Sequence, residues 1–239
     1  MVRVGSGLVQ EMAHSEVSTP IILVNFKCYL EATGKRAVRL AKYAEEASRK
    51  FGVTVAVAPQ VADIRLVSEQ TGAPVFAQHV DAIRPGSHTG HVLPESVLEA
   101  GASGFLVNHS ERRLQASVIE DILSRARELK LTTVVCANTS GIAAAVSSLE
   151  PDMIAVEPPE LIGSGVAVSK ARPEVVTDTV SKIRRINQDV IILCGAGITS
   201  GEDVKAALAL GTEGVLVASG IVKAKDQAAA INDLAAACR

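Results

Sequence analysis

Five short segments place acid–base side chains or glycines at the ends of apolar runs. They are Asn25-Phe26-Lys27, Asn108 to Arg112, Glu157-Pro158-Pro159, Gly195-Ala196-Gly197 and Ala218-Ser219-Gly220. Carboxylate, imidazole and ammonium groups move protons or stabilise an oxyanion, and glycine-rich turns let backbone N–H groups approach a phosphate. Brought together, these segments could abstract a proton next to a carbonyl in a small phosphorylated sugar, a reaction that requires no metal or redox cofactor.

Glu157 is the candidate general base. It ends the apolar run DMIAVE, where a rigid, partly desolvated carboxylate becomes a stronger base. Pro158 and Pro159 then restrict the backbone to extended conformations. Residues 158–168 contain two glycines and little charge, a composition that predicts a lid over a bound ligand. On position alone, an ordinary glutamate at a strand end is the alternative.

His109 and Lys27 are the candidate electrophiles. We expect a helix to start at Ser110-Glu111, where unpaired N–H groups and the positive dipole end keep the imidazole of His109 neutral. Lys27 could neutralise a phosphate or an oxyanion, and Asn25 adds a neutral donor. A hydrogen-bonded structural histidine and a solvated loop lysine are the alternatives.

Three further histidines, His79, His88 and His91, share one segment. No carboxylate or cysteine completes a recognisable ligand spacing around them, so we predict no metal site there.

Eight apolar, strand-length runs must position these groups. They are IILVNF from 21, VTVAVAP from 53, PVFAQ from 74, GFLVN from 104, TTVVCAN from 132, DMIAVE from 152, VIILCG from 190 and EGVLVA from 213. Continuous hydrophobicity indicates strands buried on both faces, as in parallel sheets covered by helices. Between them, residues such as Val176, Thr179, Val180 and Ile183 follow helical spacing.

Eight strand–helix units of about 27 residues each predict an α/β fold, a (β/α)8 barrel with eight parallel strands and outer helices. A doubly wound open sheet is the alternative. We expect residues 21–239 to form this single domain and residues 1–20 to be a disordered N-terminal extension. The fifth and sixth runs start only 20 residues apart, which predicts a short helix between them.

Composition excludes several classes of function. Hydrophobic residues make up 48% of the 239 residues and charged residues 21%, which excludes general disorder. The net charge of −2 and the aromatic content of 3% argue against a nucleic-acid partner. No run of about 18 apolar residues and no signal peptide is present, so we expect a soluble cytoplasmic protein with no membrane partner. Four scattered cysteines fit reduced thiols.

These motifs together resemble the triosephosphate isomerase family, whose fold is the TIM barrel. The resemblance covers residues 21–238 and rests on Asn25-Phe26-Lys27, on His109 to Arg112 (HSER), on Ala155 to Gly165 and on Thr89-Gly90. The segments EPPELIGSG, CGAGI and ASGIVKAKD resemble the archaeal branch.

The resemblance implies interconversion of D-glyceraldehyde 3-phosphate and dihydroxyacetone phosphate through an enediolate, in glycolysis and gluconeogenesis. It implies Glu157 as base, His109 as electrophile and Lys27 as stabiliser of negative charge. This family is itself a standard example of pKa tuning and lid closure, so the roles of base and histidine come with the resemblance. Further implied residues are the ligand Asn25, the phosphate donors Ile162, Gly163, Gly197, Ala218 and Ser219, and the supporting Glu111 and Cys136.

The sequence departs from the family at its last two turns. Cys194 to Gly197 stand where many relatives have Tyr-Gly-Gly-Ser, so a tyrosine and a serine that latch the closed lid are lost. Ala218-Ser219 replace a pair of glycines but keep the backbone donors. Trimmed helices accompany tetramers in the archaeal branch, so the resemblance favours a homotetramer over a dimer.

Two rival functions follow from the same fold. One is another phosphosugar enzyme, such as an epimerase or an indole glycerol phosphate synthase, but those lack this combination of His109, Glu157 and Lys27. The other is a barrel that binds phosphate without catalysis. Such a protein would bind phosphoglycolate without turning over substrate.

Overall fold

The computed structural model describes residues 18–157 and 172–239, and in them eight parallel strands form one sheet. The strands are β1 (Ile21–Asn25), β2 (Thr54–Ala58), β3 (Phe76–Ala77), β4 (Gly104–Val107), β5 (Thr132–Ala137), β6 (Met153–Val156), β7 (Ile191–Gly195) and β8 (Gly214–Val217). Each strand lies in one of the eight apolar runs. Their order in the sheet, β2-β1-β8-β7-β6-β5-β4-β3, follows the chain around a ring.

The two edge strands meet and nearly close this ring. Val57 of β2 forms a parallel bridge with Val75, and its N–H donates to the carbonyl of Pro74 over 2.9 Å. Strand β3 has only two residues, in part because Pro74 has no N–H to give to a ladder. The predicted (β/α)8 barrel is therefore confirmed, and the doubly wound alternative is wrong.

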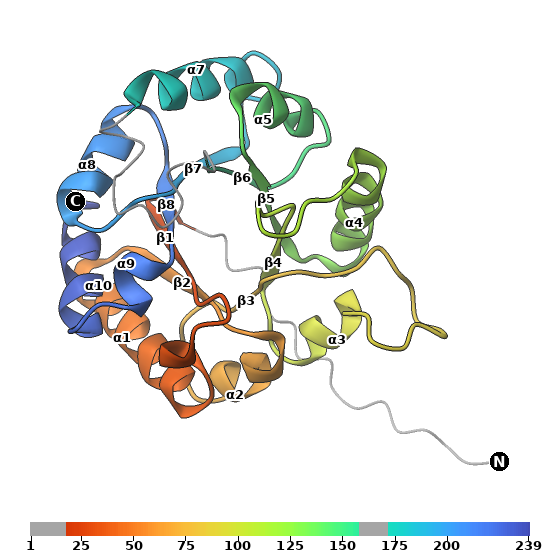
Figure 1. The fold of residues 1–239 in the computed structure, drawn as a ribbon, viewed down its shortest axis with the longest axis horizontal. Coiled ribbons are helices and arrows are strands. Elements are labelled where there is room, and N and C mark those ends of the chain that lie inside the picture. Colours follow the sequence, from red (N-terminus) through yellow and green to blue (C-terminus); the bar gives the residue numbers. More distant parts are fainter. Residues whose placement is uncertain (1–17, 158–171) are drawn as a thin grey trace.

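Helices surround the strands on the outside, as Figure 1 shows. They are α1 (Lys35–Phe51), α2 (Ile64–Ser68), α3 (Pro94–Glu99), α4 (Ala116–Leu129), α5 (Ser140–Ser147), α7 (Pro173–Arg184), α8 (Gly201–Ala209), α9 (Ser219–Val222) and α10 (Gln227–Ala236), with 3-10 turns η1 (Leu30–Ala32) and η2 (Val61–Asp63). Helix α5 has eight residues, as the short spacing of the fifth and sixth runs predicts.

Alternate residues of the strands build two separate apolar layers. On β1, Ile22 and Val24 pack in a cluster that includes helix residues such as Leu40. Ile21 and Leu23 pack instead with the inward residues of the other strands. Because successive side chains of a strand point to opposite faces, the second cluster fills the barrel and the first joins barrel to helices.

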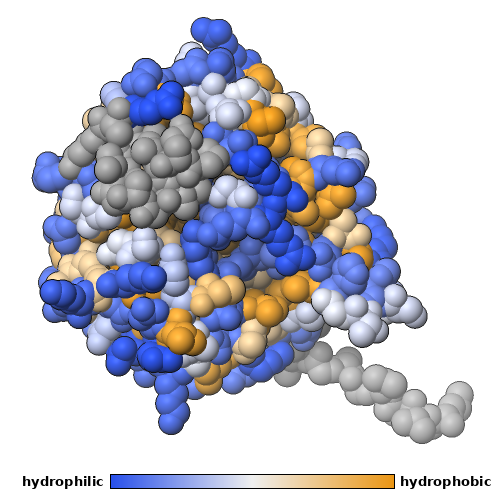
Figure 2. All heavy atoms as spheres, in the orientation of Figure 1, coloured by the Kyte–Doolittle hydropathy of each residue, from blue (hydrophilic) through white to orange (hydrophobic). Residues whose placement is uncertain are grey.

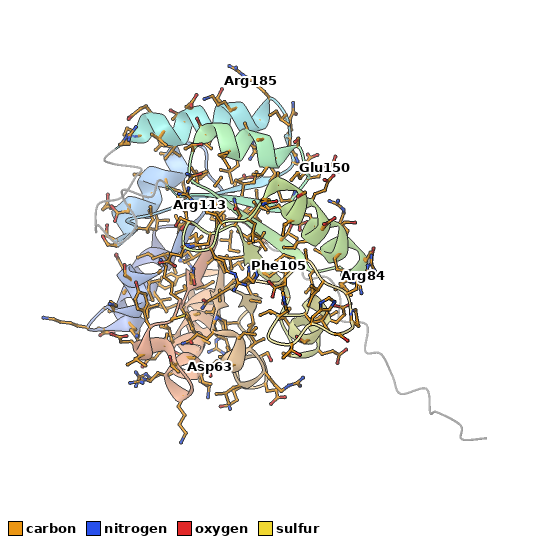
Figure 3. The ribbon with its side chains drawn as sticks, turned by 45° about the vertical axis from the view of Figure 1, so that its right-hand side comes forward. Asp63, Arg84, Phe105, Arg113, Glu150 and Arg185 are labelled. Carbon is orange, nitrogen blue, oxygen red and sulfur yellow. The ribbon has the colours of Figure 1, made fainter. Side chains whose placement is uncertain are left out.

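The outer layer is continuous and the surface is mostly hydrophilic. Phe105 of β4 is fully buried, and Figure 3 places it among densely packed side chains while Arg84, Glu150 and Arg185 lie at the periphery. The face seen in Figure 2 is largely blue, with hydrophobic residues gathered on the side where Figure 1 places α4 and α5. Among residues 18–157 and 172–239, none of the helices has the length and hydrophobicity to cross a bilayer.

The predicted N-terminal extension lies mostly outside the described residues, and it stays a prediction for residues 1–17. Ser18 is described, and its hydroxyl forms a 2.7 Å hydrogen bond with that of Thr54 at the start of β2.

Candidate active site

The carboxyl ends of the strands turn polar at the positions that continue the inward rows of the barrel. Asn25 follows Leu23 on β1 by two residues, and Glu157 follows Ala155 of β6 by two residues. Since the period of a strand is two, both side chains aim into the barrel mouth. Asn25 and Glu157 are each 5% exposed, so the polar mouth is nearly dry.

A cavity of about 220 Å³ opens at this mouth. The predicted residues that line it are Asn25, Lys27, Glu111, Glu157, Gly197, Ala218 and Ser219. They come from the ends of four strands and from the segment after β4, so barrel closure alone brings them together. The predicted donors Ile162 and Gly163 and the lid predicted over residues 158–168 lie outside the described residues.

The carboxylate of Glu157 lies between strands β5 and β7. The backbone N–H of Glu157 donates to the carbonyl of Ala137 over 2.8 Å, which continues the β5–β6 ladder. The buried Cys136 side chain makes a hydrogen bond to Glu157, and burial together with that carboxylate raises the pKa of the thiol well above its usual value. Cys136 is thus a neutral thiol against the carboxylate, and Oε2 of Glu157 has no hydrogen-bond partner among the described residues.

His109 faces Glu157 across the mouth. Its Nε2 lies 3.4 Å from Oε1 of Glu157, and its Nδ1 accepts the backbone N–H of Glu111 over 3.1 Å. An Nδ1 that accepts a hydrogen bond carries no proton, so in the neutral ring the proton is on Nε2. Nε2 is buried and has no hydrogen-bond partner in the described part of the chain.

The expected helix start at Ser110-Glu111 is wrong. Helix α4 begins at Ala116, and His109 lies instead in a turn closed by the N–H of Arg112, which donates to the carbonyl of His109 over 2.8 Å. The turn directs the N–H of Glu111 to the imidazole, so a single local hydrogen bond sets the ring's tautomer without a helix dipole. Nearby, Asn108 accepts the N–H of Leu114 and donates to the carbonyl of Cys136.

Lys27 is fixed at the end of its side chain and in its backbone. Its Nζ donates to Oε1 of Glu111 over 2.9 Å, and its backbone N–H donates to Oδ1 of Asn25 over 2.9 Å. Its φ of 47° lies in the left-handed region, which non-glycine residues rarely adopt. The ammonium is thereby held at the cavity wall.

Two turns form the wall of the cavity across β7 and β8. Ala196 and Gly197 have φ of 77° and 75°, and α9 begins at Ser219 directly after Ala218. These small residues expose the backbone to the cavity. Gly220 lets the two turns touch, since a β-carbon there would lie 2.4 Å from the carbonyl oxygen of Ile198.

Several residues of the site were missed from the sequence. Tyr29, Ile198 and Thr199 line the cavity, and Lys223 stacks its ammonium over the ring of Tyr29 at 4.5 Å. Gln78 lies behind the cavity wall and bonds the backbone of Lys27. The period-two pattern of PVFAQ was the signal for Gln78, because it follows the inward Phe76 by two residues.

Two of the three loop histidines lie against one carboxylate, that of Asp81. His79 Nε2 lies 3.0 Å from Oδ1 of Asp81, and His91 Nδ1 lies 3.5 Å from Oδ2. Asp81 also accepts the N–H of Val92, which pins the base of the segment 82–91. His88 contacts His91 ring to ring, at 5.9 Å between centroids.

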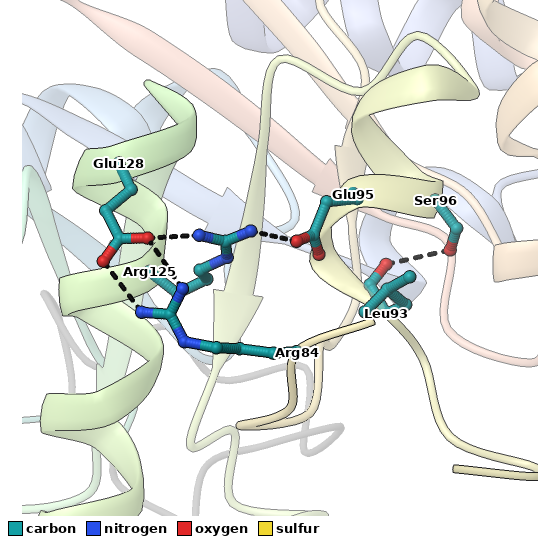
Figure 4. Close-up of polar contacts among 6 residues, drawn as sticks. All are labelled: Arg84, Leu93, Glu95, Ser96, Arg125 and Glu128. Atoms are coloured by element: carbon teal, nitrogen blue, oxygen red, sulfur yellow. Dashed lines mark hydrogen bonds and ion pairs between the residues drawn. The ribbon is translucent and has the colours of Figure 1, made fainter. Parts of the chain in front are cut away.

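An ion network ties this segment to two helices (Figure 4). Arg84 pairs with Glu128 of α4 at 2.9 Å, and Arg125 of α4 pairs with both Glu128 and Glu95 of α3. Hydrogen bonds from Arg84 and then Arg125 lower the pKa of Glu128. The ion pair between Arg84 and Glu128 therefore anchors the start of the segment 82–91 to helix α4.

The chain is similar to known proteins of one family. The family model described as triosephosphate isomerase matches residues 20–235. Proteins named triosephosphate isomerase from Methanocaldococcus jannaschii and Methanothermus fervidus are 53% and 54% identical to the chain, over 90% of it and 98% and 97% of their own lengths. The protein of that name from Methanosarcina mazei is 52% identical over 91% of the chain and 98% of its own length.

Proposed function

The chain belongs to the triosephosphate isomerase family, and we propose that Glu157, His109 and Lys27 carry out the reaction at the described cavity. The protein is an isomerase that interconverts D-glyceraldehyde 3-phosphate and dihydroxyacetone phosphate, a step of glycolysis that gluconeogenesis uses in reverse. The observation that supports these roles best is the buried pair of Glu157 Oε1 and His109 Nε2 at 3.4 Å.

Proton transfer in this proposal runs between two carbons through one carboxylate. Glu157 removes the proton from the carbon next to the substrate carbonyl, and the electron pair left on that carbon moves to give an enediolate. Glu157 then returns the proton to the neighbouring carbon. The thiol of Cys136 and the nearly dry surroundings hold the carboxylate in place for both transfers.

His109 polarises the carbonyl in this scheme and moves protons between the two oxygens. Its neutral ring donates from Nε2, and the Glu111 N–H on Nδ1 supports that tautomer. A neutral imidazole has a donor strength suited to an enediolate oxygen, because the pKa values of donor and acceptor are then closer than with an imidazolium.

Lys27 supplies the positive charge for the enediolate and the phosphate. Glu111, which accepts from its ammonium, orients it, and Asn25 binds the substrate from the same wall. Backbone donors of Gly197, Ala218 and Ser219 bind the phosphate, together with Ile162 and Gly163 of the predicted lid. Lid closure then excludes water and protects the enediolate from loss of phosphate.

Assembly and location complete the proposal. We favour a homotetramer over a dimer and a cytoplasmic protein that needs neither a nucleic-acid nor a membrane partner. The short α5, its exposed Ile142 and the rooted segment around Thr89-Gly90 support association with further copies. Light scattering coupled to gel filtration measures the mass, and a monomer or a dimer at micromolar concentration would contradict this part.

A coupled assay of purified protein tests the function. We expect rapid conversion of glyceraldehyde 3-phosphate to dihydroxyacetone phosphate without added metal. Glu157→Gln should lower turnover by roughly 10²- to 10⁴-fold, the range for a positioned general base. A folded wild-type protein without turnover at several temperatures would move the function to another phosphosugar or to binding alone, and a variant with half the activity would refute the base.

A further inference from the structure

We propose that Gln78 is a positioning residue that holds Lys27 in its left-handed backbone conformation and so aims the ammonium into the cavity. The inference deepens the proposed function, because it rests on the role of Lys27. Gln78 does not line the cavity and acts through Lys27, not on the substrate.

The side-chain amide of Gln78 spans two neighbouring strand ends. Its Nε2 donates to the carbonyl of Lys27 over 2.9 Å and to the carbonyl of Ala58 over 3.0 Å. The Ala58 carbonyl also accepts the N–H of Phe26 over 3.0 Å. One amide therefore links the end of β2 to the segment after β1 that carries Lys27.

The backbone of Lys27 needs such a link. With φ at 47° it is in a conformation that side chains disfavour and that persists only when the surroundings hold it. Oδ1 of Asn25 fixes the N–H side of the residue and Gln78 fixes its carbonyl side. With both contacts made, the direction of the side chain is determined before a substrate arrives.

Both groups that accept hydrogen bonds from the Gln78 amide are backbone carbonyls. The side chain at position 78 must therefore be a hydrogen-bond donor as well as have the right length. A carbonyl only accepts hydrogen bonds, so the residue at position 78 must donate twice. Glutamate has the shape of glutamine but offers oxygens alone when ionised, and it would repel both carbonyls. Methionine has a similar length and offers no donor.

Gln78→Met and Gln78→Glu are therefore the test variants. We expect Gln78→Met to lower kcat/KM by about 10- to 100-fold, the scale of a misplaced catalytic group, and to weaken inhibition by phosphoglycolate in the same way. Gln78→Glu should be at least as impaired near pH 8. It should recover in part relative to the wild type as the pH falls toward the ordinary glutamate pKa of about 4.3, since the protonated carboxyl regains one donor.

A double-mutant cycle with Lys27→Ala separates positioning from a general structural role. If Gln78 acts through Lys27, Gln78→Met should cause little further loss of kcat/KM in the Lys27→Ala background. Losses that multiply would overturn the proposal, as would a Gln78→Met variant that loses stability but keeps kcat/KM. If Gln78→Met does not fold, the pH profile of Gln78→Glu decides alone, and a profile parallel to the wild type overturns it.

Asn187→Leu provides a matched control. The Asn187 amide oxygen accepts the N–H groups of Asp189 and Val190, before the first residue of β7 and so at the opposite end of the barrel. Its loss should lower stability and leave kcat/KM unchanged. Failure of the proposed function reads out differently: a wild type without turnover would refute the reaction, and a Lys27→Ala variant with full activity would refute the role of Lys27, whatever Gln78 does.

Discussion

Gly195 leaves the space that the side chain of Glu157 occupies. A β-carbon on Gly195 would lie 2.5 Å from Cγ and 3.2 Å from the carboxyl carbon of Glu157. The ladder between β6 and β7 explains this closeness, because Val156 pairs with Cys194 and the next residues along are Glu157 and Gly195. The sequence suggested Gly195 as part of a phosphate turn, and the structure gives it this second role.

Gly195→Ala should therefore impair catalysis by moving Glu157 away from His109. We expect kcat to fall by about 100-fold, the effect of an ångström of misplacement, with the KM changed less. Steady-state kinetics measure both constants. Gly141→Ala on α5, where a β-carbon has room, is the control and should keep full activity. Equal activities of the two alanine variants would contradict the packing argument.

Lys27→Ala should weaken both binding and catalysis. The ammonium lies at the cavity wall, and in the proposed mechanism it stabilises the charge of the bound phosphate as well as that of the enediolate. We expect a higher KM, a lower kcat and weaker inhibition by phosphoglycolate. Inhibition equal to that of the wild type would count against the assignment.

Gly220→Ala should act on the phosphate wall and not on the base. The new β-carbon would meet the Ile198 oxygen at 2.4 Å and Cα of Thr199 at 3.1 Å, which forces the turns after β7 and β8 apart. We expect the KM to rise by about tenfold or more, equivalent to about 1.4 kcal/mol of binding, with a smaller change in kcat. Isothermal calorimetry with phosphoglycolate checks the affinity, and unchanged binding would show that the two turns bind independently.

Acid should lower the free energy of unfolding of the protein through His79 and Asp81. Burial lowers the pKa of His79 below 6.5, although its hydrogen bond to Asp81 opposes the shift. The unfolded chain then binds more protons than the folded one just below pH 6.5, so stability decreases as the pH falls through that region. At Asp81, burial would raise the pKa, but the Val92 N–H, His79 and Arg112 together lower it below 3.8. Stability falls further as the pH approaches the pKa of this carboxyl.

Urea unfolding at a series of pH values measures this dependence. His79→Gln should flatten the curve just below pH 6.5, where the histidine of the unfolded chain takes up its proton. The wild type and the variant should run parallel above pH 7. A variant with the same slope as the wild type below pH 6.5 would show that other groups control the acid sensitivity.

Much of this protein was determined by its sequence alone. Apolar runs without alternation have no solvent-facing side, so a parallel sheet covered by helices is the arrangement that buries them. The number and spacing of the runs then indicated a barrel, and its carboxyl ends located Asn25, Lys27, His109 and Glu157. Local patterns were enough to predict the strands and their order, because each strand is a continuous apolar run and neighbouring runs in the chain become neighbouring strands in the barrel.

The tertiary structure decided what depends on closure of the ring and on register between strands. Gln78 reaches Lys27 only because β3 returns beside β2, 51 residues along the chain from the lysine it holds. The contact of Gly195 with Glu157 follows from the β6–β7 register. Such pairings join groups far apart in sequence at distances of about 3 Å, which hydrophobic pattern does not encode.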